Sequence, residues 1–326
     1  MIIQNGLINH QKVRNRNPRF IQRINKNKES VMVKVEHLTG IFQADEDIKL
    51  QSYTWKPANK KIKAICLAIH GGLTYSEDWA ILSPAFAQKH IALMSIDLRY
   101  HGRYAQHNPG QKVYFHIESY EQYIEDIHHY YLHIKKQYPD TPIFILGHSN
   151  GGLISLYYGL TRAPQEIKGF LISSPWLKNK VLVPPLLLKL LKIIAFVHPK
   201  FEVTPADISE HLTHDRKIME HHVEASAKGL RGKTATAKLG LESMKTQQYV
   251  IEHIKEWKKF PLWAVIAGDD YLADAETSLK ALSQVPKNLI TTEFYENNYH
   301  ENFNELNREE IFEKMLNWIE QRLKNK

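Results

Sequence analysis

Short apolar runs alternate with helix-like stretches along most of this chain, and this alternation limits its possible folds more than any other feature. Continuous apolar runs that end in turns occur at 63–70, 91–97, 142–149, 167–174, 261–268 and 288–296. Such runs are typical of strands that are buried on both faces. Stretches with helical spacing separate them, notably 77–89, 117–138, 151–160 and 309–324. The pattern predicts an α/β fold, in which a mostly parallel sheet carries helices on both faces.

Two parts of the chain depart from this pattern. Residues 1–28 hold seven Lys or Arg and no acid, which leaves 36 basic and 35 acidic residues elsewhere. Between about 175 and 258 the alternation breaks. We therefore predict a flexible basic arm (1–30), a core (31–174 and 259–326) and a helical cap insertion (175–258). Within the core, 31–43 and 48–55 have the period of two antiparallel strands.

The charge distribution bears on partners and location. Because the core is nearly neutral, no nucleic-acid partner is expected. The arm is interpreted as solvated, with contact to an anionic membrane surface as the alternative. The single cysteine, Cys66, lies in an apolar run, which excludes an internal disulfide and suits a reducing compartment. No run approaches the ~20 apolar residues that span a bilayer, and no secretory signal is visible. We expect a cytoplasmic protein, with membrane association through the arm or the cap.

One apolar stretch in the predicted cap has two interpretations. Residues 186–198 read LLLKLLKIIAFVH, with Lys189 and Lys192 on one helical face. The stretch is either a lid helix that lines an acyl pocket or rests on a lipid interface, or a helix buried against the core.

The motif Gly147-His148-Ser149-Asn150-Gly151 lies directly between an expected strand and an expected helix. In this setting a G-x-S-x-G motif forms a strained strand-to-helix turn from which the serine projects. Glycines two residues before and after the serine leave room for the turn. We therefore interpret Ser149 as a nucleophile rather than as an incidental serine in a glycine-rich turn.

A serine nucleophile needs a histidine base that is held by a carboxylate. With this motif the chain order is Ser, then Asp or Glu, then His. His300 is the histidine that follows the last expected strand, so it is the predicted base. Asp270 is the predicted acid, from a group that also holds Asp269 and Asp274. Asp274 is the second choice, because it could instead cap a following helix.

Tetrahedral intermediates need two backbone N–H donors. We predict the amides of Asn150, just after the nucleophile, and of Gly72, in the turn that follows the strand 63–70. No cofactor or metal is predicted. His128, His129 and His133 lie on one expected helix, but no metal-binding motif accompanies them.

Five segments occur in order along the chain: HGG (70–72), DLRYHGRY (97–104), GHSNGGL (147–153), AGDDYLAD (267–274) and YHENFNE (299–305). Together they resemble the monoacylglycerol lipase and lysophospholipase branch of the α/β-hydrolases, which is grouped with serine aminopeptidase-like proteins. The cap stretches HLTHDRKIMEHH and KTATAKLGLESM extend the resemblance. It implies an α/β-hydrolase fold, a triad of Ser149, Asp270 and His300, and oxyanion donors at Gly72 and Asn150.

The chain departs from the family pattern at three positions. Tyr100 and Tyr104 stand where the family's D-x-R-G-H-G-x-S pattern has glycine and serine, and Asn150 stands where methionine is common. None of these changes removes a catalytic atom, because the oxyanion donor is a backbone amide. They bear on the shape of the pocket and therefore on substrate preference.

The expected function is hydrolysis of a lipid-like acyl ester, most consistent with a monoacylglycerol lipase or lysophospholipase. A serine peptidase that releases small N-terminal residues is the first alternative. It predicts an acidic pocket for the substrate amine, and the predicted cap shows no clear acidic cluster. A non-catalytic binding protein on the same fold is the second alternative, although such proteins normally lose a triad residue. Fold alone does not decide among the three.

Overall fold

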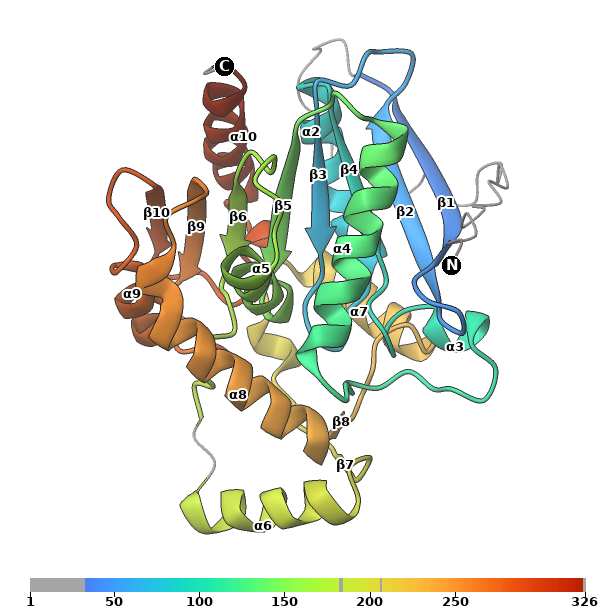
Figure 1. Cartoon of the computed structure of the whole chain (residues 1–326), viewed down its shortest axis with the longest axis vertical. Coiled ribbons are helices and arrows are strands. Elements are labelled where there is room, and N and C mark those ends of the chain that lie inside the picture. Colours follow the sequence, from blue (N-terminus) through green and yellow to red (C-terminus); the bar gives the residue numbers. More distant parts are fainter. Residues whose placement is uncertain (1–32, 182–183, 206, 325–326) are drawn as a thin grey trace.

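The computed structural model describes residues 33–181, 184–205 and 207–324. Within these residues, eight strands form one sheet in the order β1-β2-β4-β3-β5-β6-β9-β10 (Figure 1). β2 runs antiparallel to β1 and β4, and the strands from β4 to β10 are mutually parallel. The strands are β1 (Val35–Gln43), β2 (Lys49–Pro57), β3 (Ala64–Ile69), β4 (Ile91–Ile96), β5 (Ile143–His148), β6 (Phe170–Ser173), β9 (Leu262–Ala267) and β10 (Ile290–Tyr295). The predicted mostly parallel sheet is confirmed.

The two faces of the sheet are covered by different helices. Along β3, Ile65 and Leu67 pack into one hydrophobic cluster, whereas Cys66 and Ala68 pack into another. This division follows from the alternation of side chains along a strand. The first cluster includes residues of α4 (Tyr120–Gln137), α5 (Asn150–Thr161) and α9 (Ala275–Leu282), and the second includes residues of α2 (Ser83–Gln88) and α10 (Arg308–Lys324).

Local signals explain where the elements differ from the sequence prediction. The helix expected over 77–89 is a 3-10 helix, η1 (Ser76–Leu82), followed by α2, whose second residue is Pro84. Proline has no N–H for the preceding turn, so an uninterrupted helix cannot form there. The helix expected from 117 begins at Tyr120, because the Ser119 side chain accepts a hydrogen bond from the amide of Glu121 and caps the helix. A short helix, α3 (Tyr104–His107), was not expected.

Between β6 and β9 the chain leaves the sheet, and we call residues 175–258 the cap segment. α8 contacts both α5 and α6, and the two-residue strands β7 and β8 pair antiparallel. The elements of the cap segment are α6 (Pro185–Val197), β7 (Glu202–Val203), η2 (Ser209–His211), α7 (Arg216–Ala227), β8 (Ala235–Thr236), α8 (Ala237–His253) and η3 (Ile254–Glu256). The predicted basic arm lies outside the described residues.

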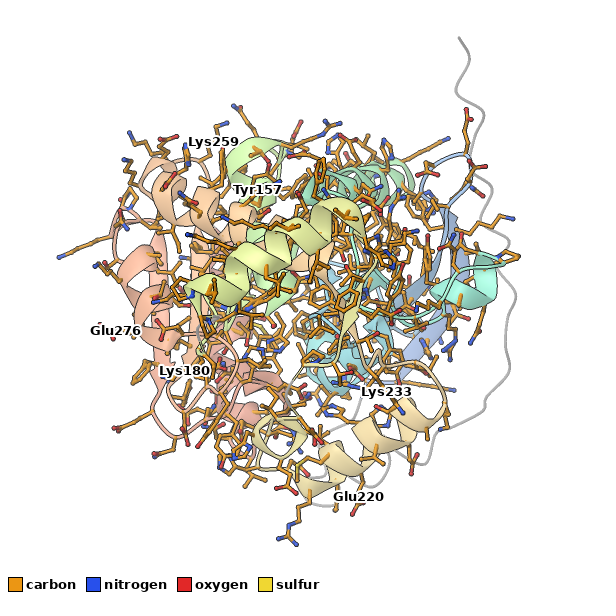
Figure 2. The ribbon with its side chains drawn as sticks, turned by 90° about the horizontal axis from the view of Figure 1, so that it is seen from below. Tyr157, Lys180, Glu220, Lys233, Lys259 and Glu276 are labelled. Carbon is orange, nitrogen blue, oxygen red and sulfur yellow. The ribbon has the colours of Figure 1, made fainter. Side chains whose placement is uncertain are left out.

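α6 is the apolar cap stretch, and most of its side chains face solvent. Leu186 is 80% exposed and Phe196 is 90% exposed, and Ala195 is the one residue of the helix that is buried. Figure 2, viewed from the side on which α6 lies, shows this helix crossing the outside of the molecule. The alternative of a helix buried against the core is therefore wrong. Among the described helices, none is long and apolar enough to cross a membrane.

Candidate active site

Ser149 occupies a strained turn between β5 and α5. Its backbone has φ 55° and ψ −117°, in a region that residues with a side chain rarely adopt. Two hydrogen bonds hold the turn: the amide of Ser149 donates to the carbonyl of Ser173 (2.9 Å), and the amide of Trp176 donates to the carbonyl of Ser149 (3.0 Å). The serine therefore lies at the carboxyl end of the parallel strands, where ligands bind in folds of this kind.

The two glycines of the motif allow this turn to form. A Cβ on Gly147 would lie 2.3 Å from the carbonyl oxygen of Gly151, and a Cβ on Gly151 would lie 1.9 Å from the carbonyl oxygen of Ile69. Both separations are shorter than any real contact of such atoms. The crowding arises because α5 starts directly against the end of β3, so larger residues would push the serine out of position.

His300 and Asp270 are brought together from different strand ends. Nδ1 of His300 lies 2.7 Å from Oδ2 of Asp270, and both side chains are buried. The other carboxylate oxygen of Asp270 accepts the backbone amides of Leu272 (2.8 Å) and Ala273 (2.9 Å), which fix its orientation. By contrast, Asp274 accepts the amide of Thr277 and caps α9. The arrangement matches an acid that orients a histidine base.

The remaining ring nitrogen of His300 is available for chemistry. Nε2 is buried and makes no hydrogen bond within the described part of the chain. The ring of His300 lies 4.9 Å, centroid to centroid, from the ring of His148, the residue before Ser149. His300 therefore lies beside the turn of Ser149 without being hydrogen-bonded to that residue.

Charges around His300 favour its protonated form. Burial lowers its pKa, but the Asp270 carboxylate and its hydrogen bond, together with the charge of Glu301, outweigh burial and raise the pKa above its usual value. The opposite holds for His148, where burial and the neighbouring His300 lower the pKa to about 3. His148 is thus neutral next to a histidine that takes up a proton readily.

The turn after β3, which carries the predicted oxyanion donor Gly72, lies against Ser149. A Cβ on Gly71 would lie 3.2 Å from the Cβ of Ser149, and a Cβ on Gly72 would meet the ring of Phe115 at 2.3 Å. His70 stabilises the turn through both ring nitrogens. Its Nε2 accepts a hydrogen bond from the amide of Leu98 (2.9 Å). The proton therefore lies on Nδ1, which donates to the carbonyl of Gly71 (2.7 Å). Burial holds the pKa of His70 well below its usual value, which keeps this neutral tautomer.

Asn150, the other predicted oxyanion residue, begins α5 and is fully buried. Its side-chain oxygen accepts a hydrogen bond from the hydroxyl of Tyr120 (2.7 Å). Its backbone amide is at the helix N-terminus, where the helix dipole stabilises negative charge.

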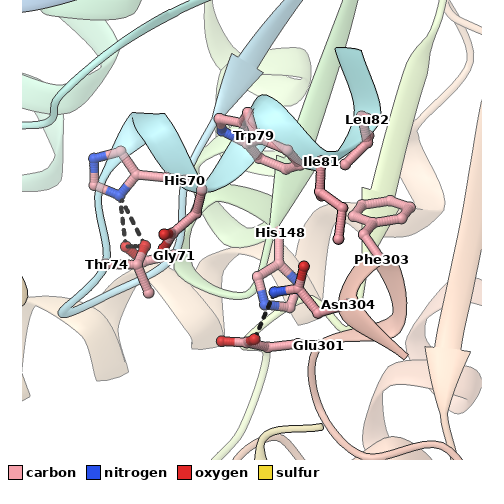
Figure 3. A pocket seen from close by; sticks show the side chains of 11 residues that line it. His70, Gly71, Thr74, Trp79, Ile81, Leu82, His148, Glu301, Phe303 and Asn304 are labelled. Carbon is pink, nitrogen blue, oxygen red and sulfur yellow. Dashed lines mark hydrogen bonds between the residues drawn. The ribbon is translucent and has the colours of Figure 1, made fainter. Parts of the chain in front are cut away.

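A small pocket opens beside His148, the residue before Ser149 (Figure 3). Its wall includes Gly71, His148 and Glu301, and its apolar part comes from Trp79 and Phe303. It lies between η1 and η4 (Asn302–Asn304), the 3-10 helix just after His300.

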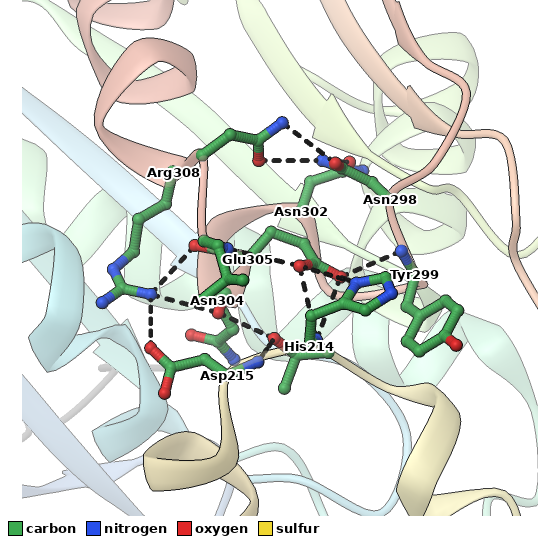
Figure 4. A network of polar contacts seen from close by, with 11 residues as sticks. His214, Asp215, Asn298, Tyr299, Asn302, Asn304, Glu305 and Arg308 are labelled. Carbon is green, nitrogen blue, oxygen red and sulfur yellow. Dashed lines mark hydrogen bonds and ion pairs between the residues drawn. The ribbon is translucent and has the colours of Figure 1, made fainter.

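Several buried polar residues support the site although the sequence did not single them out. Asp97, at the end of β4, accepts the amides of Ser76 (2.9 Å) and Arg103 (2.9 Å), and burial raises its pKa to about 6. Glu305, after η4, accepts the amide of Tyr299 (2.9 Å) and Nδ1 of His214 (3.0 Å) from the cap segment (Figure 4). The motifs DLRYHGRY and YHENFNE contained these residues, but only the fold shows their partners.

Comparison with known proteins places the chain in a family. The family model described as serine aminopeptidase, S33, matches residues 60–307. The chain belongs to this family. The S33 family model covers the β3 turn, Ser149, Asp270 and His300. The resemblance to α/β-hydrolases is thereby confirmed.

Relatives of this S33-family chain include enzymes with assigned names. It is 26% identical to an uncharacterized abhydrolase domain-containing protein of Dictyostelium discoideum (88% of this chain, 29% of that protein). It is 26% identical to phospholipase YtpA of Bacillus subtilis (80% and 95%) and 25% identical to a monoacylglycerol lipase of Mycolicibacterium smegmatis (81% and 90%). A crystal structure of a soluble variant of monoglyceride lipase from Saccharomyces cerevisiae superposes with a TM-score of 0.72 at 16% identity (91% and 98%). The chain is therefore an α/β-hydrolase, and its named relatives are lipases and a phospholipase.

Proposed function

We propose that this protein hydrolyses carboxylic esters of lipid-like acyl groups, as a monoacylglycerol lipase or a lysophospholipase, with Ser149 as nucleophile, His300 as base and Asp270 as the acid that orients it. The observation that carries the proposal is the 2.7 Å hydrogen bond between His300 and Asp270 beside the strained turn of Ser149. The names of the Bacillus and Mycolicibacterium relatives support a lipid ester as substrate.

In the proposed reaction, Nε2 of His300 takes the proton from Ser149 as Oγ attacks the ester carbonyl. The amides of Gly72 and Asn150 stabilise the oxyanion of the tetrahedral intermediate. His300 then donates the proton to the leaving alcohol, and an acyl-enzyme remains on Ser149. Water, deprotonated by His300, then attacks the acyl-enzyme, and His300 returns the proton to Oγ of Ser149 as the fatty acid leaves. The reaction requires no cofactor.

The cap segment supplies surfaces that suit an acyl chain. A groove of about 840 Å³ lies between α6 and α8, with Leu177, Phe196, Leu241, Met244 and Ile251 among its lining residues. Leu177 directly follows Trp176, whose amide is bonded to the carbonyl of Ser149. We propose that the acyl chain extends from Ser149 toward this groove and that the cap segment, residues 175–258, covers the site.

The exposed face of α6 supports contact with lipid. Leu190, Ile193 and Val197 add to the exposed apolar surface, and lysines accompany them on the same helix. Apolar side chains flanked by basic ones are typical of helices that lie in a membrane interface. We propose a cytoplasmic protein that binds anionic membrane surfaces peripherally, through α6 and the basic arm.

A panel of substrates tests the proposed function. Wild type, Ser149→Ala and the matched control Ser283→Ala, at an exposed serine of the α9 end, would be assayed on p-nitrophenyl esters, monoacylglycerols, lysophospholipids and aminoacyl anilides. We expect wild type and Ser283→Ala to prefer long-chain esters and Ser149→Ala to be inactive. Turnover of the anilides alone would favour the peptidase alternative, and turnover of no substrate would leave the non-catalytic alternative.

A further inference from the structure

The segment that carries His300 is joined to the cap segment by buried ionic contacts. The amide of Glu301 donates to the carbonyl of Leu212 (2.9 Å). The Glu301 carboxylate lies 3.5 Å from Nη2 of Arg231 and 3.5 Å from Nε2 of His222. Glu301, Arg231 and His222 are all buried. Arg231 also reaches the core, because its Nη1 lies 2.6 Å from Oδ2 of Asp78 in η1.

A second set of contacts joins the two segments at the end of η4 and the start of α10 (Figure 4). The hydroxyl of Thr213 donates to the carbonyl of Asn304 (2.8 Å), and Arg308 pairs with Asp215 at 2.8 Å. The chain just after His300 is therefore joined to the residues around α7 at Glu301 and again at Asn304 and Arg308. This part of the cap segment is built into the site, in contrast to the exposed α6.

Buried charges so close to a histidine base act on its protonation as well as its position. Asp270, which follows β9, His148, at the end of β5, and Glu301, the next residue in the chain, lie beside His300. Arg231 and His222 contact Glu301, and Asp78 contacts Arg231. Burial and the charge of Arg231 lower the pKa of His222 to about 3, so His222 is neutral. Arg231 therefore carries the positive charge that faces the carboxylates of Glu301 and Asp78.

We propose that Glu301 and Arg231 are positioning residues of the proposed hydrolase: their contact fixes the His300 loop to the cap segment, and the charge of Arg231 balances that of Glu301 beside the base. The proposal rests on the role of His300 under the proposed function. Under this proposal the cap segment helps to position the catalytic histidine, in addition to covering the site.

The test is the pH profile of kcat/KM on a soluble short-chain ester, for Glu301→Gln, Arg231→Met and the double variant. Loss of the carboxylate should lower the pKa of His300 and move the acid limb to lower pH by about half a unit or more. Loss of the guanidinium should move the limb to higher pH, and the double variant should return toward wild type. Lys228→Met, in an exposed pair with Glu224 on the same cap segment, is the matched control and should leave the limb in place.

Each outcome decides the proposal. The proposal predicts shifts of the acid limb in opposite directions in the two single variants. Shifts in the same direction, or no shift in either variant, would overturn it, because a purely structural contact would change stability and rate without moving the limb in opposite directions. If Arg231→Met does not fold, Arg231→Lys keeps the charge and should hold the limb near wild type while Glu301→Gln moves it. If wild type hydrolyses no ester, the proposed function fails, and the NMR titration of the His300–Asp270 hydrogen-bond proton in the same variants tests the positioning contact by itself.

Discussion

Nδ1 of His300 lies 2.7 Å from Oδ2 of Asp270, although the two residues are 30 positions apart and follow different strands. Asp274, only four residues further on, instead caps α9 through the amide of Thr277. We therefore expect Asp270→Asn to lower kcat by about 10⁴-fold, because the amide would stabilise the wrong histidine tautomer.

Asp274→Asn is the matched control for that variant. It should keep ester turnover and cost at most about 1 kcal/mol of stability, since asparagine also caps helices well. Steady-state kinetics and thermal unfolding of both variants would check this. Equal losses of kcat would show that Asp270 does not act alone.

The raised pKa of His300 predicts the acid side of the pH profile. The reaction needs the neutral ring, so kcat/KM should fall as the pH drops through this pKa, which lies above the usual value of about 6.5. Titration of kcat/KM with a soluble p-nitrophenyl ester would give the value. A limb well below pH 6 would mean that the Asp270 charge does not act on the base as the geometry implies.

The exposed face of α6 predicts a selective loss of activity on lipid surfaces. Leu186→Ser with Val197→Ser should weaken binding to anionic vesicles and lower turnover of vesicle-borne monoacylglycerol, while turnover of a soluble ester stays unchanged. Leu132→Ser removes an exposed leucine of α4 instead and should change neither. Vesicle sedimentation and kinetics would separate the two results. Unchanged vesicle binding by the double variant would contradict the proposed role of α6.

Replacement of two glycines by alanine should change the stability of the protein in opposite directions. Gly102 has φ +56°, and a Cβ there would lie 2.1 Å from Oδ2 of Asp97. Gly102→Ala should therefore reduce the free energy of unfolding by about 2–3 kcal/mol. Gly240 lies inside α8 with open space around it, so Gly240→Ala should raise stability by up to about 1 kcal/mol. Denaturant unfolding would measure both, and a stable Gly102→Ala protein would argue against the crowding at Asp97.

The sheet could be predicted from sequence because each buried strand is a local signal, an apolar run that ends in a turn. Helix boundaries depended on single residues, such as Pro84 in α2 and the capping Ser119, and these moved the predicted ends. The orientation of the 186–198 stretch was undecided, because an apolar helix has the same pattern whether it faces the core or a lipid surface. The structure exposes it.

The order of the site residues along the chain was enough to select Ser149, His300 and a short list of carboxylates. It favoured Asp270 but left Asp274 as a second choice, because both follow the same strand and only their hydrogen bonds differ. The contact of Arg231 with Asp78 could not be predicted from the sequence, because 153 positions separate the two residues. The sequence alone does not show which oppositely charged residue a charged side chain pairs with, because only the fold brings the two together.

The most direct test of the central claim is to identify the residue that becomes acylated. Wild type, Ser149→Ala and Ser283→Ala would be mixed with a fluorophosphonate or a slow p-nitrophenyl ester, and the modified peptide would be located by mass spectrometry. The account predicts a single adduct on Ser149 in wild type and in Ser283→Ala, and none in Ser149→Ala. An adduct on another residue, or the same adduct in Ser149→Ala, would contradict it.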